Sequence, residues 1–142
     1  MNKTTHQVRI EAFMRKAGQE LPVRPEVPHV DVRRLRATLI LEEAHETIMA
    51  LGFSPVDLSR EFYHPDIVSI ADGCADLSVV TIGTLSACGI PDRRLLETVD
   101  RWNNAKFGPG STKNVLGKWI KPPDFQGPSE DIKRYIEELC RG

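Results

Sequence analysis

The sequence has little of what marks several large classes of protein. Its three cysteines, Cys74, Cys88 and Cys140, are scattered and form no CxxC pair, which excludes a disulfide framework and a zinc knuckle and fits a reducing compartment. Aromatic residues make up only 6% of the chain, so any core must be mostly aliphatic. The net charge is −1, whereas general nucleic-acid binders are strongly basic. No stable nucleic-acid partner is therefore expected.

Long uncharged apolar runs are also lacking. The most apolar stretch, residues 67–90, carries Asp72 and Asp76, whereas a membrane span needs about 18 or more apolar residues. The first residues lack the apolar segment and cleavage site of a signal peptide. We therefore expect a cytoplasmic protein without a membrane partner. A length of 142 residues, 40% of them hydrophobic, predicts one globular domain over residues 1–142.

Proline and glycine divide the chain into about five predicted helices, and no segment alternates convincingly enough for a strand. The first helix has an apolar stripe of Val8, Phe13 and Ala17. A proline-rich extended arm follows, and Asp31 is the expected N-cap of the second helix. The fold class is therefore all-α, a helical bundle. The expected helices cover residues 5–17, 31–51, 64–88, 91–106 and 128–140, with a flexible basic loop over about 107–127.

Three glutamates form the first cluster with chemical potential. Glu42, Glu43 and Glu46 fall on one face of the second predicted helix, since a helix turns by about 100° per residue. Like charges at spacings of three and four residues destabilise a helix by roughly 0.2–0.5 kcal/mol per pair. The flanking residues are largely apolar, so we expect these carboxylates near the core, where something must offset their repulsion.

Two aspartates form the second cluster. Asp72 and Asp76 lie one turn apart on the third predicted helix, and residues 66–91 contain no lysine or arginine to pair with them. Unpaired carboxylates beside apolar residues are costly. Oxygen ligands from two facing helices suit Mg²⁺, or else Mn²⁺. Glu42-x-x-His45 also matches half of a di-iron site, but no second such unit exists, so His45 is expected on the helix surface.

Basic residues are segregated from these acids. Residues 101–123 contain no Asp or Glu but include five bases, among them Arg101, Lys106, Lys118 and Lys121. Metal ions neutralise phosphates under attack, and lysines hold phosphates as point charges, so the pattern favours a polyphosphate substrate. Asn103 offers an amide to the same ligand. A merely solvated loop is the alternative, and no Walker-type phosphate loop is present.

Four segments in this order resemble a known family. RRLRATLILEEAHE, IADGCADLSVVTIGTLSACGI, RWNNAK and GKWIKPPDFQGP are similar to the MazG-like and phosphoribosyl-ATP pyrophosphohydrolase-like all-α nucleotide pyrophosphatases, over about residues 13–136. The likeness is greatest to small, single-domain, dimeric dUTPase-like members. Glu43 and Glu46 match the family's E-x-x-E. Asp76 matches the last acid of the second motif, where Gly73 replaces a glutamate and Asp72 fits a D-x-x-x-D variant.

The resemblance implies metal-dependent hydrolysis of a nucleoside triphosphate, such as dUTP, between its α and β phosphates, yielding a monophosphate and pyrophosphate. It implies Glu43, Glu46, Asp72 and Asp76 as metal ligands. Glu43, Glu46 and Asp76 are the first choices, and Glu42 or Asp72 either ligates a second metal or acts as the general base. It also implies a homodimer or dimer of dimers that completes the site. The implied substrate contacts are Arg101, Asn103, Lys106, Lys118 and Lys121.

Two other functions remain open from the sequence. Gly73 in the second motif supports a catalytically lapsed module that binds or senses a nucleotide. A purely structural bundle with solvent-facing acids is the third hypothesis.

Overall fold

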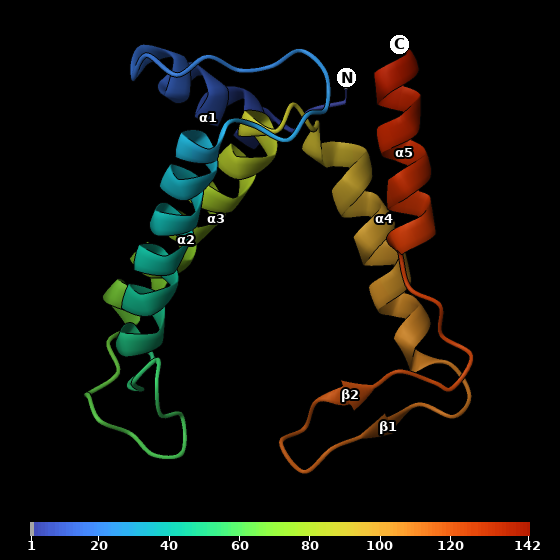
Figure 1. The fold of residues 1–142 in the computed structure, drawn as a ribbon. Helices are drawn as coiled ribbons and strands as arrows, with labels where there is room; N and C mark the ends of the chain where they lie inside the picture. Colours follow the sequence, from blue (N-terminus) through green and yellow to red (C-terminus); the bar gives the residue numbers. More distant parts are fainter. Residues whose placement is uncertain (1) are drawn as a thin grey trace. The chain divides into compact units, whose positions relative to one another are not determined.

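The computed structural model describes residues 2–142, and 59% of the chain is helical (Figure 1). The predicted all-α fold of about five helices is confirmed. The elements in chain order are α1 (Thr5–Lys16), α2 (Val30–Ala50), α3 (Ile67–Ala87), α4 (Asp92–Asn104), the 3₁₀ turn η1 (Ala105–Phe107), β1 (Thr112–Lys113), β2 (Trp119–Ile120) and α5 (Ser129–Arg141).

The chain divides into two compact units, and each is described by itself. The N-terminal unit comprises residues 5–90, with α1, α2 and α3. The C-terminal unit comprises residues 2–4 and 91–142, with α4, α5 and the β1–β2 hairpin. The expectation of one domain over residues 1–142 stays a prediction.

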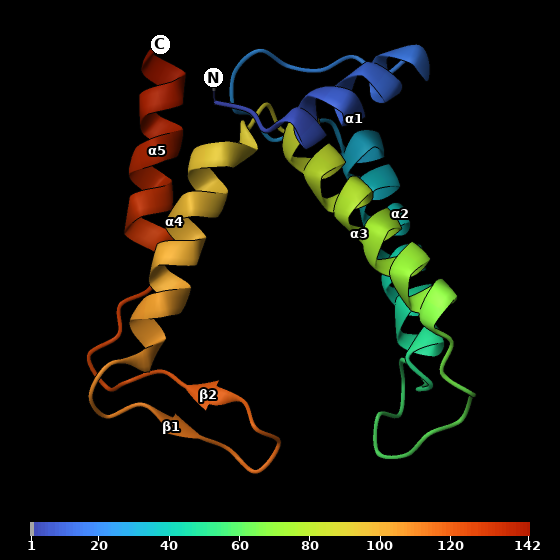
Figure 2. The ribbon, with the colours of Figure 1, turned by 180° about the vertical axis from the view of Figure 1, so that it is seen from behind.

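Helices α2 and α3 form the long pair of the N-terminal unit and lie side by side in both views (Figures 1 and 2). Asp66 caps α3, because its carboxylate accepts hydrogen bonds from the Ser69 N–H at 2.9 Å and the Ser69 hydroxyl at 2.6 Å. Gly89, with φ 70°, ends α3 in the left-handed conformation that glycine adopts at little cost. Helix α2 begins one residue before the predicted cap, Asp31. His29 is its N-cap, and the imidazole Nδ1 accepts from the Asp31 N–H at 3.2 Å.

Helix α1 packs through a different face from the one predicted. Val8 and Phe13 are exposed, as is Ala17 beyond the end of the helix, so the predicted apolar stripe is wrong. The buried face instead runs through Gln7, Ile10, Glu11 and Met14. This face has better helical spacing than the predicted stripe, but two of its four side chains are polar, which hid it from a search for apolar residues.

The small apolar core of the N-terminal unit lies where α1 meets the C-terminal half of α3. It consists of Ile10, Met14, Ile82 and Ala87, with Leu21, Val79 and Leu85 packed against it. Gln7 belongs to the same contact and is satisfied there, since its amide donates to the Ser86 hydroxyl at 3.0 Å and the Ile90 carbonyl at 2.9 Å. The proline-rich arm returns to this end, and the Glu26 N–H donates to the Cys88 carbonyl at 3.0 Å.

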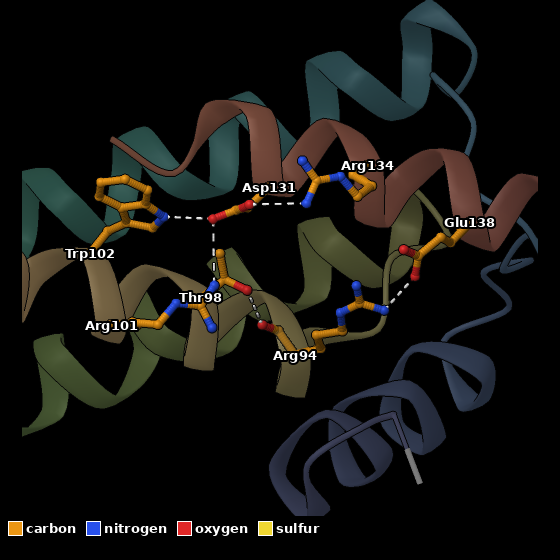
Figure 3. A network of polar contacts seen from close by, with 7 residues as sticks. All are labelled: Arg94, Thr98, Arg101, Trp102, Asp131, Arg134 and Glu138. Carbon is orange, nitrogen blue, oxygen red and sulfur yellow. Dashed lines mark hydrogen bonds and ion pairs between the residues drawn. The ribbon is translucent and has the colours of Figure 1, made fainter. Parts of the chain in front are cut away.

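The C-terminal unit pairs α4 with α5 through polar contacts (Figure 3). Asp131 on α5 accepts from the Trp102 indole at 2.8 Å and forms ion pairs with Arg101 and Arg134, both at 3.5 Å. The Trp102 hydrogen bond is the main reason that the pKa of Asp131 lies below its usual range. A second cross-helix ion pair joins Arg94 to Glu138.

The segment predicted as a flexible loop contains a short hairpin. Thr112 pairs with Ile120, and Lys113 pairs with Trp119, in antiparallel register. The expectation of no strand is therefore wrong for these four residues. A strand of two residues is too short to show the repeated alternation of apolar and polar residues by which strands are recognised in a sequence. Phe107 meets Trp119 edge to face at 5.3 Å between ring centres, which anchors the hairpin to η1.

Candidate active site

The strongest candidate for chemistry is the acidic cluster, which comprises Glu42, Glu43 and Glu46 on α2 and Asp72 and Asp76 on α3. Glu43 lies at its centre. Its side chain is half-buried, and Oε2 is enclosed without a hydrogen-bond partner among residues 2–142. Burial is the first cause that raises the pKa of Glu43, followed by the charge of Asp76 and then by the charges of Glu46, Glu42 and Asp72. The structure thus brings all five predicted acids into one electrostatic cluster.

The members of the cluster differ in exposure. Asp76 is half-buried like Glu43, whereas Glu42, Glu46 and Asp72 are exposed. The expectation that the carboxylates lie near the core is therefore met only by Glu43 and Asp76. The exposed three remain within reach of solvent and of a ligand.

A close helix contact fixes the register of the two acidic helices. Gly73 on α3 is buried against Thr47 on α2, and a Cβ atom at position 73 would lie 2.6 Å from Thr47 Oγ1 and 3.2 Å from Thr47 Cα. Thr47 lies one turn beyond Glu43 and donates its hydroxyl to the Glu43 carbonyl at 2.7 Å. A Cβ at position 73 would force Thr47 and its helix to shift, so Gly73 has a packing role, and Asp72 and Asp76 are the acids that α3 presents here.

An open cleft of about 400 Å³ adjoins the cluster. This acidic cleft lies between the C-terminal end of α2, the α2–α3 connection and the first turns of α3. Its volume falls in the range of small-molecule sites, roughly 300–1,000 Å³. Its walls are formed by Glu46, Met49, Ala50, Tyr63, His64, Asp66, Ser69, Asp72 and Gly73.

The donor set of the cluster suits a hard divalent cation. Within residues 2–142, no three Asp, Glu, His or Cys side chains are grouped as a ready metal site. The enclosed Glu43 oxygen nevertheless lacks a donor, and four neighbouring carboxylates raise the free energy of its charged form. Carboxylate oxygens from two helices are the ligands that Mg²⁺ accepts, and a cation would relieve both problems. The residues present therefore fit such an ion.

The predicted phosphate-binding residues lie in the C-terminal unit and do not share one environment. Arg101 lines a cavity of about 180 Å³ between α4 and α5 and pairs with Asp131. Lys106 donates to the Asn103 amide oxygen at 2.9 Å, so these two form a local pair. Lys118 and Lys121 line a separate groove of about 280 Å³ on the hairpin. Their contact with a substrate stays a prediction.

Sequence reasoning missed Thr47 and the residues of the α2–α3 connection that line the acidic cleft. Thr47 could have been found, because it lies one turn after Glu43 on the same face. Tyr63 and His64 precede α3 in an irregular segment, where no periodicity indicates what a side chain faces.

Helix α3 also meets a test for membrane spans. By length and composition alone it could cross a membrane, which is weak evidence because core helices of soluble proteins meet the same criterion. Asp72 and Asp76 lie within it and belong to the acidic cluster.

Comparison with protein families identifies a relationship. The sequence model of a family described as phosphoribosyl-ATP pyrophosphohydrolase matches residues 10–103, about two thirds of the chain. The matched region contains all five acids of the cluster, as well as Arg101 and Asn103, and it ends before Lys106, Lys118 and Lys121. No curated protein matches the sequence.

Proposed function

Because the chain belongs to the phosphoribosyl-ATP pyrophosphohydrolase family, within the MazG-like all-α superfamily, we propose that it hydrolyses a nucleoside triphosphate between the α and β phosphates. The family implies pyrophosphohydrolase activity on a nucleotide. The products would be a nucleoside monophosphate and pyrophosphate. Candidate substrates are the ribo- and deoxyribonucleoside triphosphates, dUTP among them, and the triphosphate that the family's description names.

One observation supports this proposal most. Glu43 holds an enclosed carboxylate oxygen that has no donor among residues 2–142, and the charges of four further carboxylates on two helices act on it. A chain that only needed to pack these helices would gain stability from neutral side chains here. The arrangement is typical of a site that binds a positively charged group.

The family typically uses a divalent metal, and we propose Mg²⁺, with Mn²⁺ as a substitute. Glu43, Glu46, Asp72 and Asp76 would hold it. When bound, the ion supplies positive charge that offsets the negative charge of the phosphates. The attacking water must lose a proton to a carboxylate oxygen, and Glu42 and Asp72 are the proposed acceptors because both are exposed beside the cluster.

The basic residues of the C-terminal unit are the proposed phosphate contacts. Lys118 and Lys121 line the hairpin groove, where their ammonium groups offer charge to an oxyanion. The other proposed contacts are Arg101, Asn103 and Lys106.

We also propose a homodimer or a dimer of dimers in the cytoplasm. The family is soluble, yet Leu41, Ile67 and Val68 are 69%, 76% and 72% exposed on α2 and α3. Apolar surface of this kind is commonly buried between subunits. Sedimentation of the purified protein measures its mass directly, and a monomer at micromolar concentration would contradict the dimer.

The activity is tested by pyrophosphate release from a panel of nucleotides with Mg²⁺. The panel should include the common ribo- and deoxyribonucleoside triphosphates, dUTP and phosphoribosyl-ATP. We expect turnover of at least one, and its loss in Glu46→Gln and Asp76→Asn. Glu20→Gln, an exposed carboxylate on the proline-rich arm, is the matched control and should retain activity. A folded protein that hydrolyses none of the panel with Mg²⁺ or Mn²⁺ would refute the proposal.

The catalytically lapsed binding module is the alternative function. Its support was Gly73, read as a lost ligand. The contact with Thr47 gives that glycine a packing reason as well, but it supplies no carboxylate in place of the missing one. Tight nucleotide binding without turnover would favour the alternative.

A further inference from the structure

The end of the α2–α3 connection is held firmly against the end of α2. The Phe62 and Tyr63 N–H groups both donate to the Gly52 carbonyl, at 2.8 and 3.1 Å, and the Asp66 N–H donates to the Ala50 carbonyl at 3.1 Å. Gly52 has φ 99°, and a Cβ there would lie 3.0 Å from the Tyr63 carbonyl oxygen. These hydrogen bonds hold the backbone of residues 62–66 against the end of α2. Tyr63 and His64 belong to this held segment.

Tyr63 and His64 both line the acidic cleft, together with residues of two other kinds. Glu46 and Asp72 contribute carboxylates of the acidic cluster. Met49, Ala50 and the Tyr63 ring contribute apolar surface. The Tyr63 side chain is 48% exposed. The acidic cleft is thus lined by carboxylates and also by apolar and aromatic residues.

His64 adds an imidazole to the same lining. Its imidazole makes no hydrogen bond or ion pair with any residue of the described part of the chain, positions 2–142, and it lines the cleft. A neutral imidazole offers one donor and one acceptor. The imidazole can hydrogen-bond to the edge of a heterocycle whose face stacks on the aromatic ring of Tyr63.

We propose that Tyr63 and His64 bind the nucleobase of the substrate and set the nucleotide preference. The proposal rests on the proposed function, because it assumes that the phosphates lie at the acidic cluster. The base then packs against the Tyr63 ring, with Met49 and Ala50 beside it, while the His64 imidazole hydrogen-bonds to the base edge. Every base has a π-face that stacks on an aromatic ring, whereas a phosphate group has none.

The test compares ligands that differ only in the base. Binding of AMP, GMP, CMP and UMP, with Mg²⁺, is measured by calorimetry against ribose 5-phosphate, which has no base. We expect the wild type to bind at least one nucleotide more tightly than ribose 5-phosphate. Tyr63→Leu should weaken nucleotide binding about 10-fold and leave ribose 5-phosphate unchanged. Tyr63→Phe and Tyr63→Trp, which keep a ring, should retain most of the binding.

Phe62→Leu is the matched control. Phe62 precedes Tyr63 and its ring contacts the Arg60 guanidinium at 4.0 Å, but it does not line the acidic cleft. It should bind nucleotides as the wild type does. His64→Ala should alter the ranking of the four nucleotides, because it removes the edge contact and keeps the stacking face.

Binding separates this inference from the proposed activity. A protein that hydrolyses nucleotides while Tyr63→Leu and the wild type bind them equally would overturn the inference and keep the activity. A protein that binds none of AMP, GMP, CMP and UMP more tightly than ribose 5-phosphate would also overturn it. Base-dependent binding that Tyr63→Leu abolishes would support it, even if no nucleotide of the panel were hydrolysed.

Discussion

Replacing Gly73 with alanine tests whether the α2–α3 contact fixes the acidic cluster. The new methyl group would lie 2.6 Å from Thr47 Oγ1 and 3.2 Å from Thr47 Cα. The hydroxyl can rotate away, but the Cα is backbone, so the helices must separate locally. Overpacking of this kind costs about 1–3 kcal/mol. Alanine favours a helix over glycine by about 1 kcal/mol, so the expected net loss is about 1 kcal/mol.

Urea unfolding followed by circular dichroism measures this balance. Ala75→Gly, an exposed position two residues along the same helix, is the control that measures helix propensity alone and should lose about 1 kcal/mol. In a double-mutant cycle, Thr47→Ala should relieve part of the Gly73→Ala cost, with a coupling of about 0.5–3 kcal/mol.

Activity adds a second measure, since separated helices would move Asp72 and Asp76 away from Glu43. Gly73→Ala should therefore lower kcat/KM for the nucleotide hydrolysed. The reasoning is refuted if Gly73→Ala gains about 1 kcal/mol, as propensity alone would give, and keeps full activity.

Three further predictions follow from the described contacts. Because the folded pKa values of Asp131 and Glu138 lie below their usual range, the stability they add is present above about pH 4 and lost as the pH falls through those lowered values. Acid titration of the near-ultraviolet dichroism of Trp102 should show this, and Asp131→Asn should make the transition less pH-dependent. The buried Arg36 guanidinium donates to the Val80 carbonyl at 2.9 Å and to the Thr84 hydroxyl at 3.1 Å. Methionine should be tolerated better than lysine at this position, because lysine keeps the buried charge and cannot make both of these hydrogen bonds. Urea unfolding should rank Arg36→Lys below Arg36→Met, and the reverse order would contradict this. Mg²⁺ should raise the melting temperature of the wild type more than that of Glu43→Gln, measured by calorimetry at equal ion concentration, and equal shifts would place the ion elsewhere.

Helix ends and the acidic pattern could be predicted because they depend on local chemistry. Gly89 ends α3 directly after the predicted helix. The helix begins at Ile67 and not at the predicted residue 64, because Asp66 is its N-cap. The five acids were identified from their helical spacing, and the structure brings them together. Which face of α1 is buried could not be predicted, because Gln7 and Glu11 are buried through contacts made by distant residues.

The packing role of Gly73 also lay beyond the sequence. A glycine in a helix can mark a lost side chain or a close approach, and only the position of Thr47 on the neighbouring helix distinguishes them. Tyr63 and His64 were missed for a similar reason. Their place in the acidic cleft depends on how the α2–α3 connection folds back onto Gly52, which involves backbone groups that every residue has.

The enclosed Glu43 carboxylate has a consequence for how this chain would evolve. Like charges gathered around it make that part of the fold less stable than neutral side chains would. Selection for yield or heat resistance alone would therefore favour substitutions at the acidic cluster first. Variants recovered in that way should have higher thermal stability and no activity. The substituted positions would therefore identify the residues needed for activity without an assay of the substrate.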